Sequence, residues 1–530
     1  MTSDLAKVAE ESAKGGFFLI VGSFFATIIS AVASIIVTRL LGQELYGQYV
    51  LSLVVPQMLF LFTDFGISQG IVKFAASLRV KGETAQMAKI IQYGLLIRTI
   101  IGCAIFLVNF ALADHFATIF HNRPEIGVYI RIASFSILFQ VVYTTVASAY
   151  VGLDKTEYSA FTTNIQAISK AAIAIALVLA GFSIFGAVVS YVAGYLIGGS
   201  IGLALLLNIM RKHSSKDDIS IGFAESLKTL VRYGMPLYIA TLLVGFIPPY
   251  QNFVLGIFTT DAAIGNYKAA VNFITLITIV SIPIITTLLP AFSKLEKTTN
   301  EKVRTFFLFA NKYTTMLIVP IVTIILAFSN EIVQIIYGPD FQTAGLFLAI
   351  YCLLYFLTGL GYLVLASMFN GLGETGTTLK INLIIFIILI FLSPMLAYFC
   401  GVVGVIIALI TSNLIGTLFG VYIAKEKYQV KFATKSIIKI YIIAAISALP
   451  ALLVLYLSQL HELATVILGG LLYLVIYLTL IPLTGIIDQN ELQTVTRVAQ
   501  KIKPFAPIFK PILKYEQWIL NTRQKKGMRH

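Results

Sequence analysis

Apolar stretches of about 20 residues recur from one end of the chain to the other, separated by short polar segments. An α-helix of that length crosses a hydrocarbon core about 30 Å thick. Segments of about ten alternating residues, the pattern of a transmembrane β-strand, do not appear. The pattern therefore predicts an all-α polytopic membrane protein of about 14 helices, placed at 16–41, 46–72, 89–113, 128–152, 159–182, 185–210, 229–257, 264–290, 306–328, 343–371, 378–399, 402–424, 437–457 and 463–485.

The distribution of basic residues predicts the orientation of these helices. Loops that join an odd helix to the following even one carry almost no Lys or Arg, whereas the other loops carry most of them. Both termini are therefore expected in the cytoplasm, in a multi-pass protein of the cell membrane. The net charge of +14 is then explained by anionic lipid of the cytoplasmic leaflet, without a nucleic acid partner. The first span is too long, and too closely flanked by Glu10 and Glu11, for a cleavable signal.

Three pairs of motifs repeat along the chain at one offset. "YGQY" at 46–49 matches "IGNY" at 264–267, "YVGLDKTEY" at 150–158 matches "FNGLGETGT" at 369–377, and "LIGGSIG" at 196–202 matches "LIGTLFG" at 414–420. The offset is 218 or 219 residues. Because it contains six helices, the two copies enter the membrane from the same side, which predicts two parallel six-helix lobes about a pseudo-two-fold axis along the membrane normal.

The repeat sets the predicted domains. Helices 1–6 form an N-lobe at 1–216, helices 7–12 form a C-lobe at 217–428, and helices 13–14 at 429–485 have no counterpart. The basic tail 486–530 is expected on the cytoplasmic membrane surface with Trp518 as anchor, or else as a solvated tail. Two GxxxG pairs, Gly198/Gly202 and Gly416/Gly420, predict close helix contacts.

Once the loops and helix ends are set aside, few ionisable residues remain inside the predicted spans: Asp64, Arg98, Lys170 and Lys268, with Arg39 at the outer end of the first span. Charges at such depth are costly in hydrocarbon. Each belongs to a polar stripe or has small neighbours one turn away. The stripes are Lys268–Asn272–Thr275, Thr163–Gln166–Lys170 and Gln57–Asp64–Ser68, and Gly94 and Gly102 flank Arg98. These helices are predicted to line one water-filled cavity.

That cavity would hold several bases and one acid. Excess positive charge favours an anionic ligand, and phosphate is the anion that Arg and Lys commonly hold together. The alternative is that Asp64 pairs with Arg98 or Arg39 while the lysines reach water. Helices 9–14 have an almost charge-free interior, which suits a long lipid chain, so a substrate with a charged head and an apolar tail fits both halves.

The chain resembles the polysaccharide-transporter branch of the multidrug/oligosaccharidyl-lipid/polysaccharide flippase superfamily. The similarity rests on the six-plus-six repeat, the two extra helices, the junction "VTRLLGQELYGQY" at 37–49, and "FTDFGISQG" at 62–70. It implies a flippase that carries polyprenyl (pyro)phosphate-linked oligosaccharides to the outer leaflet. By this resemblance Arg39, Arg98, Lys170 and Lys268 would bind phosphate, with Asp64, Gln57, Gln166 and Asn272 as polar partners in the cavity.

Other functions stay open. The resemblance extends to lipid II flippases and to cation-coupled multidrug exporters, although an exporter of cations should have buried acids. A membrane enzyme would need an acid or His cluster at a loop, and none is visible, so we expect a transporter without catalytic residues, metal or cofactor. No G-x-x-x-x-G-K-[ST] loop for a nucleotide is present. The expected partners are the lipid-linked oligosaccharide and membrane lipids, and a monomer is expected.

Overall fold

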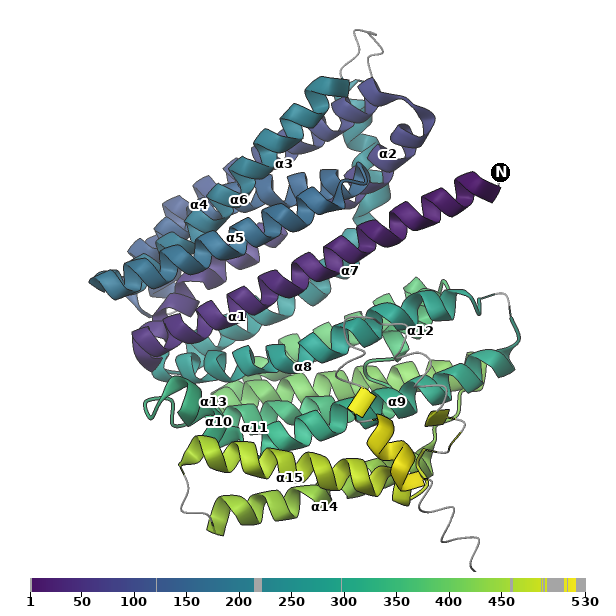
Figure 1. Ribbon diagram of the computed structural model, residues 1–530. Helices are drawn as coiled ribbons and strands as arrows, with labels where there is room; N and C mark the ends of the chain where they lie inside the picture. The colour runs from purple at the N-terminus through teal and green to yellow at the C-terminus, as the bar shows by residue number, and fades with distance from the viewer. Residues whose placement is uncertain are drawn as a thin grey trace, which may run out of the picture. The chain divides into compact units, whose positions relative to one another are not determined.

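The structure is a computed structural model, and it describes residues 2–120, 122–213, 222–296, 298–457, 461–487, 489, 491–492, 510–511 and 513–520. Throughout these ranges the chain is helical, with no strand, as the sequence predicts (Figure 1). The α-helices are α1 (Thr2–Leu61), α2 (Ile67–Lys81), α3 (Thr84–His115), α4 (Gly127–Gly152), α5 (Thr156–Leu177), α6 (Ser183–His213), α7 (Phe223–Phe258), α8 (Asp261–Ser293), α9 (Asn300–Ala327), α10 (Ser329–Tyr337), α11 (Ala344–Cys352), α12 (Leu365–Gly371), α13 (Thr375–Tyr428), α14 (Thr434–Leu457) and α15 (Glu462–Leu483). Short 3₁₀ or π segments are η1 (Phe116–Phe120), η2 (Pro124–Ile126), η3 (Val178–Phe182) and η4 (Leu353–Leu360).

Three helical stretches are long enough to cross a membrane twice. Ten candidates are long and apolar enough to span, and three of them, Val21–Leu61, Thr156–Arg211 and Thr375–Tyr428, have 41, 56 and 54 residues. About 20 residues suffice for one crossing. Each of the three bends at a glycine with positive φ, namely Gly42, Gly181 and Gly401. Dividing them there, and counting the bent pair Ala344–Leu360 and Leu365–Gly371 as one span, gives 14 crossings in the described part of the chain, which agrees with the sequence prediction.

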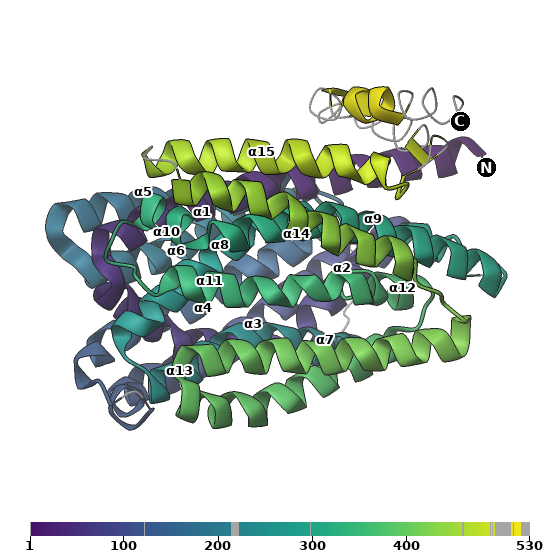
Figure 2. The same cartoon turned by 90° about the horizontal axis from the view of Figure 1, so that it is seen from below.

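The chain forms two compact units. Unit 1 contains Met1–Asn272, Tyr337–Thr343 and Phe386–Ala408, and unit 2 contains Phe273–Ile336, Ala344–Ile385 and Leu409–His530. In unit 1, α3, α4, α5 and α6 lie side by side (Figure 1), and α1 packs along α5 and α7. In unit 2, α14 lies beside α15 and α9 (Figure 2). These units are not bounded at residues 216 and 428, so the predicted lobes stay a prediction.

Backbone conformation confirms the internal repeat. Ser183 has φ 46° and ψ −130°, and Gly401, 218 residues later, has φ 54° and ψ −130°. Asp154 and Gly373 occupy equivalent places in the repeated motif "GLD"/"GLG", and both have positive φ. Such values are rare in residues other than glycine, so recurrence at the predicted offset is specific. At these two places the two copies turn the chain in the same way.

The GxxxG prediction is also confirmed. In unit 1, a Cβ at Gly198 would lie 2.8 Å from the Cβ of Gln166 on α5. In unit 2, the equivalent Gly416 faces Ile385 within the same helical hairpin. The glycines allow the neighbouring helix to approach.

Two helix breaks lie within apolar sequence. The second predicted span, 46–72, ends early because α1 stops at Leu61, and Phe65 and Gly66 then take positive φ before α2 begins. The predicted span 343–371 contains a 3₁₀ segment and a bend of 47°. Hydropathy does not locate either break, because the first lies beside Thr63 and Asp64 in a run that is otherwise mostly apolar and the second lies among apolar residues.

Most of the tail, at 493–509 and 521–530, lies outside the described residues. Residues 513–520 are helical, and Leu513 and Leu520 join the apolar core of α14 and α15. Trp518 is 63% exposed and stacks on Tyr515.

Candidate functional site

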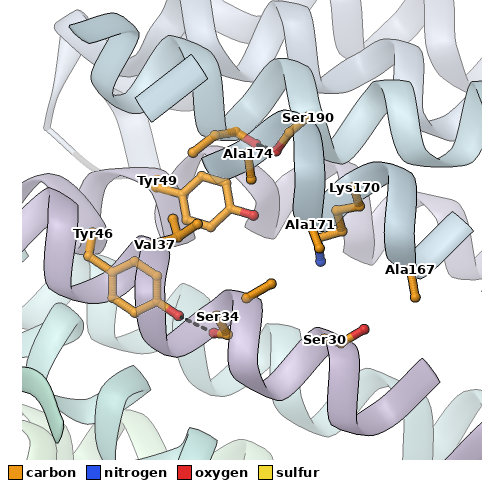
Figure 3. A pocket seen from close by; sticks show the side chains of 12 residues that line it. Ser30, Ser34, Val37, Tyr46, Tyr49, Ala167, Lys170, Ala171, Ala174 and Ser190 are labelled. Carbon is orange, nitrogen blue, oxygen red and sulfur yellow. Dashed lines mark hydrogen bonds between the residues drawn. The ribbon is translucent and has the colours of Figure 1, made fainter. Parts of the chain in front are cut away.

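Lys170 on α5 lines a small cavity inside unit 1. The cavity measures about 50 Å³, and its other walls come from α1 and α6. In Figure 3 the Lys170 side chain points into the space that faces Ser30, Ser34 and Tyr49. The ammonium lies 5.0 Å from the centre of the Tyr191 ring, where the ring's negative face stabilises a cation. No acidic residue lines this cavity.

The start of α8 brings a second lysine and an amide to the same region. The ammonium of Lys268 lies close enough to Lys170 for the two charges to repel each other. One turn further along α8, Asn272 donates from Nδ2 to Ser34 Oγ (2.9 Å) and to the Tyr46 hydroxyl (3.1 Å), both of which line the cavity. Among the described residues, neither lysine has an ion pair or hydrogen bond. This region of unit 1 therefore carries two positive charges without a counter-charge.

Four tyrosines that the sequence did not single out as site residues lie near Lys170: Tyr46 and Tyr49 line the cavity, the Tyr191 ring faces the ammonium, and Tyr195 packs on Tyr191. Tyr46 and Tyr49 come from α1, with ring centroids 5.9 Å apart. Tyr191 and Tyr195 come from α6, with ring centroids 5.3 Å apart. The Tyr191 hydroxyl accepts from Gln57 Nε2 at 3.3 Å. The signal was present as "YGQY" and as "YVAGY" at 191–195, where tyrosines recur three or four residues apart on one helix face.

Arg98 and Asp64 lie in a different cavity of unit 1. Arg98 is 1% exposed, and its Nε lies 3.7 Å from Asp64 Oδ1. Its Nη1 donates to the hydroxyls of Ser68, Thr144 and Thr145 at 2.8–3.1 Å. The cavity measures about 160 Å³, and it shares no lining residue with the Lys170 cavity. This is the pairing that the sequence left open as the alternative for Asp64.

The predicted site residues thus divide between two cavities, with Arg39 and Gln166 outside both. Lys170, Lys268, Asn272 and Gln57 surround or adjoin the tyrosine-lined cavity. Arg98 and Asp64 form the second cavity, so the expectation of a single cavity for all of the bases is not met within unit 1. Arg39 is exposed and lines neither cavity. Gln166 packs against Gly198 of α6. The binding roles of these residues stay predictions.

The two copies of the repeated "LG…YG/IG" motif contact each other reciprocally in unit 1. Gln48 Nε2 donates to Asp261 Oδ2 at 2.9 Å, and Asn266 Nδ2 donates to Gln43 Oε1 at 2.5 Å. Each of these pairs maps onto the other at an offset of 218 residues. A Cβ at Gly47 would collide with the Asp261 carbonyl, and one at Gly265 would collide with the Gln43 carbonyl. We call this contact, formed by residues 43–48 and 261–266, the glycine joint.

Arg123, from the segment between α3 and α4, binds Asp261 on one side of the glycine joint. Its guanidinium forms an ion pair with Asp261 and donates to the carbonyls of Gly256 and Thr259 at 2.7 Å. The ion pair is only 14% and 12% exposed, so solvent screens it less than a surface pair. The joint therefore ties the α3–α4 and α7–α8 connections to the bend in α1.

The fold defined by these helices is that of multi-pass transporters. A lipid II flippase, MurJ, in an inward closed conformation has a TM-score of 0.71 at 17% identity, covering 88% of this chain and 99% of that one. An inward-facing multidrug resistance MATE family transporter of the MOP superfamily has a TM-score of 0.61 at 17% identity, covering 76% and 94%. At these identities the likeness concerns the fold.

Residues 12–296 match the model of the polysaccharide biosynthesis protein family, and the chain belongs to that family. This confirms the resemblance seen in the sequence. A curated relative is the probable low-salt glycan biosynthesis flippase Agl15 of Haloferax volcanii, 23% identical over 259 residues, which are 48% of this chain and 52% of that protein. The alignment thus spans about half the length of the curated relative.

Proposed function

We propose that this protein is a flippase that moves a polyprenyl (pyro)phosphate-linked oligosaccharide from the cytoplasmic to the outer leaflet of the cell membrane, for assembly of a cell-surface polysaccharide or glycoprotein glycan. Family membership and the glycan flippase relative support the glycan. The proposal that the protein binds the phosphate rests on Lys170 and Lys268. Their positive charges repel each other, and no acidic residue lines the cavity. A phosphate group removes that repulsion and gains two charge-assisted hydrogen bonds.

The surroundings of the lysines suit such a head group. Serine and tyrosine hydroxyls from α1 and α6 line the cavity and can donate to further phosphate oxygens. A multidrug exporter of cations would instead need negative charge here, so the two lysines favour the anionic lipid. Because the fold is similar to that of the lipid II flippase MurJ, a lipid II-like substrate stays an alternative within the same proposal.

Alternating access is part of the proposal, and the glycine joint supports it. Within the joint, two side-chain hydrogen bonds connect the repeat-related segments, from Gln48 to Asp261 and from Asn266 to Gln43, and water can replace both. In the proposed orientation, with both termini in the cytoplasm, it lies on the outer side and closes the path outward. Transport then requires the joint to part once the head group is bound.

The test measures binding and movement of a defined probe by the full-length protein. Farnesyl diphosphate linked to N-acetylglucosamine is titrated into the detergent-purified protein, and its fluorescent analogue is followed across proteoliposomes by quenching from outside. Lys170→Gln and Lys268→Gln should each weaken binding by about tenfold or more, because a hydrogen bond to a charged group contributes about 1.5–3 kcal/mol. The control Lys81→Gln, at the exposed end of α2, removes the same charge. Unchanged binding and flipping in the Lys170/Lys268 double variant would refute the proposal.

A further inference from the structure

The second cavity of unit 1 differs in charge from the first. It lies beside the break between α1 and α2 and is lined by Asp64, Ser68, Arg98, Thr144, Tyr238, Thr241 and three apolar residues. Asp64 carries one negative charge and Arg98 one positive charge, so the cavity is neutral overall. A phosphate there would meet the Asp64 carboxylate, which repels it, and this argues against an anion.

Polar groups around this cavity keep unused hydrogen-bonding capacity. The buried Arg98 Nε has no hydrogen-bond partner, although leaving such a donor unpaired costs free energy. Asp64 Oδ1 accepts from the Ser68 amide at 2.9 Å, and no bond to Oδ2 is present among the described residues. The Tyr238 hydroxyl donates to the Leu61 carbonyl at 2.9 Å, so its lone pairs can still accept.

We propose that this cavity is a subsite for one sugar ring of the transported glycan. Neighbouring hydroxyls of a pyranose each donate and accept, and the cavity offers a guanidinium N–H as donor with a carboxylate and a phenol oxygen as acceptors. A neutral polyol satisfies all three without a change of charge. The inference rests on the proposed function, and it divides the head group: the Lys170 cavity takes the phosphate and the Arg98 cavity takes sugar.

The experiment compares sugar-linked and bare lipid on the same protein. Dissociation constants are measured by calorimetry on the full chain in detergent for farnesyl diphosphate and for its conjugates with N-acetylglucosamine, glucose and mannose. The reported quantity is the ratio of the bare to the conjugated dissociation constant. We expect a ratio of about ten or more for at least one conjugate, as one or two hydrogen bonds to charged groups provide.

Two variants remove the subsite in different ways. Asp64→Asn deletes the charged acceptor, and Thr241→Phe fills the cavity from an exposed position without touching the Arg98 hydrogen bonds. Both should bring the ratio towards one while binding of bare farnesyl diphosphate stays within twofold of the parent or tightens. The control Asp114→Asn loses the same charge at a site paired with Arg131 and should keep the parent ratio. Lys170→Gln should weaken both forms equally and leave the ratio unchanged.

The outcomes separate the two proposals. A parent ratio of one for all three conjugates, or a parent-like ratio in both cavity variants, overturns the sugar subsite and leaves the phosphate site standing. If neither bare nor conjugated lipid binds, the proposed function fails and the subsite fails with it.

Discussion

Substituting one glycine of the joint tests whether the joint opens. Gly47→Ala places a Cβ against the Asp261 carbonyl, and about 1 Å of extra separation is needed to reach the 3.0 Å that real Cβ contacts keep. Overpacking of this kind costs about 1–3 kcal/mol. The gain in helix propensity, about 1 kcal/mol, is the same whether the joint is closed or parted. The closed arrangement should therefore lose about 2 kcal/mol relative to the parted one, a factor of about 30 in their equilibrium.

The readout is a cysteine at a position hidden by the closed joint. Ile264 is fully buried, so Ile264→Cys, in a chain in which Cys103, Cys352 and Cys400 are replaced, reports parting through its rate of reaction with a membrane-impermeant maleimide. Gly47→Ala should raise that rate by about 30-fold, whereas Gly376→Ala, where an added Cβ meets nothing within 4 Å, should not change it. A folded Gly47→Ala protein that labels at the parent rate would show that this contact does not part as proposed.

Four further predictions follow from individual contacts. Arg123→Gln removes the ion pair with Asp261 and should raise the rate of Ile264→Cys labelling by about tenfold. The control Arg131→Gln, at an exposed ion pair, should leave that rate unchanged, and equal effects of the two variants would refute the special role of Arg123. Ser183→Gly removes the strain of a positive φ; it should raise the stability by about 1 kcal/mol and the thermal unfolding midpoint with it, whereas Gly401→Ala should lower the midpoint. A lower midpoint in Ser183→Gly would contradict the idea that Ser183 is strained. Lys312 is buried on α9 and pairs with Glu491 at 2.8 Å. Glu491→Gln should lower the stability by about 3–5 kcal/mol, and the Lys312→Met/Glu491→Leu double variant should recover most of the lost stability. Thermal unfolding measures both changes. The Lys427 ammonium lowers the pKa of Glu374 in the folded protein. This pair therefore adds stability above the ordinary carboxyl pKa of about 4.3, and the added stability is lost as the pH falls through the lower pKa of the folded state. The contribution is below about 1 kcal/mol, and it should vanish from the pH dependence of unfolding in Glu374→Gln and persist in Glu296→Gln.

The sequence predicted the helices and the repeat well because both depend on local patterns. Spans follow from runs of apolar residues, and the offset of 218 residues recurs in the backbone angles of Ser183 and Gly401. The break at Phe65 and Gly66 was missed because the hydropathy of a whole span carries no information about φ at single residues, even with Asp64 beside the break. Lys312 was left out of the charges inside the spans because it lies only six residues from the start of the predicted span 306–328, and its partner Glu491 is 179 residues away.

The candidate site was only partly accessible to sequence reasoning. Residue type and depth identified Lys170, Lys268, Arg98 and Asp64 as unusual. Which of them meet depends on how α3, α5 and α8 pack, and no helical periodicity contains that information. Arg39 was grouped with the others by charge alone, and the structure leaves it exposed.

The glycine joint has the form of an isologous interface, in which one surface mates with its own copy as in a two-fold homodimer. Here both copies belong to one polypeptide, so each can change without the other. Gln43 has an amide where its counterpart Asp261 has a carboxylate that binds Arg123. Because both halves of this self-complementary contact belong to one chain, one edge can be strong and the other weak, which is impossible for two identical subunits while their symmetry holds.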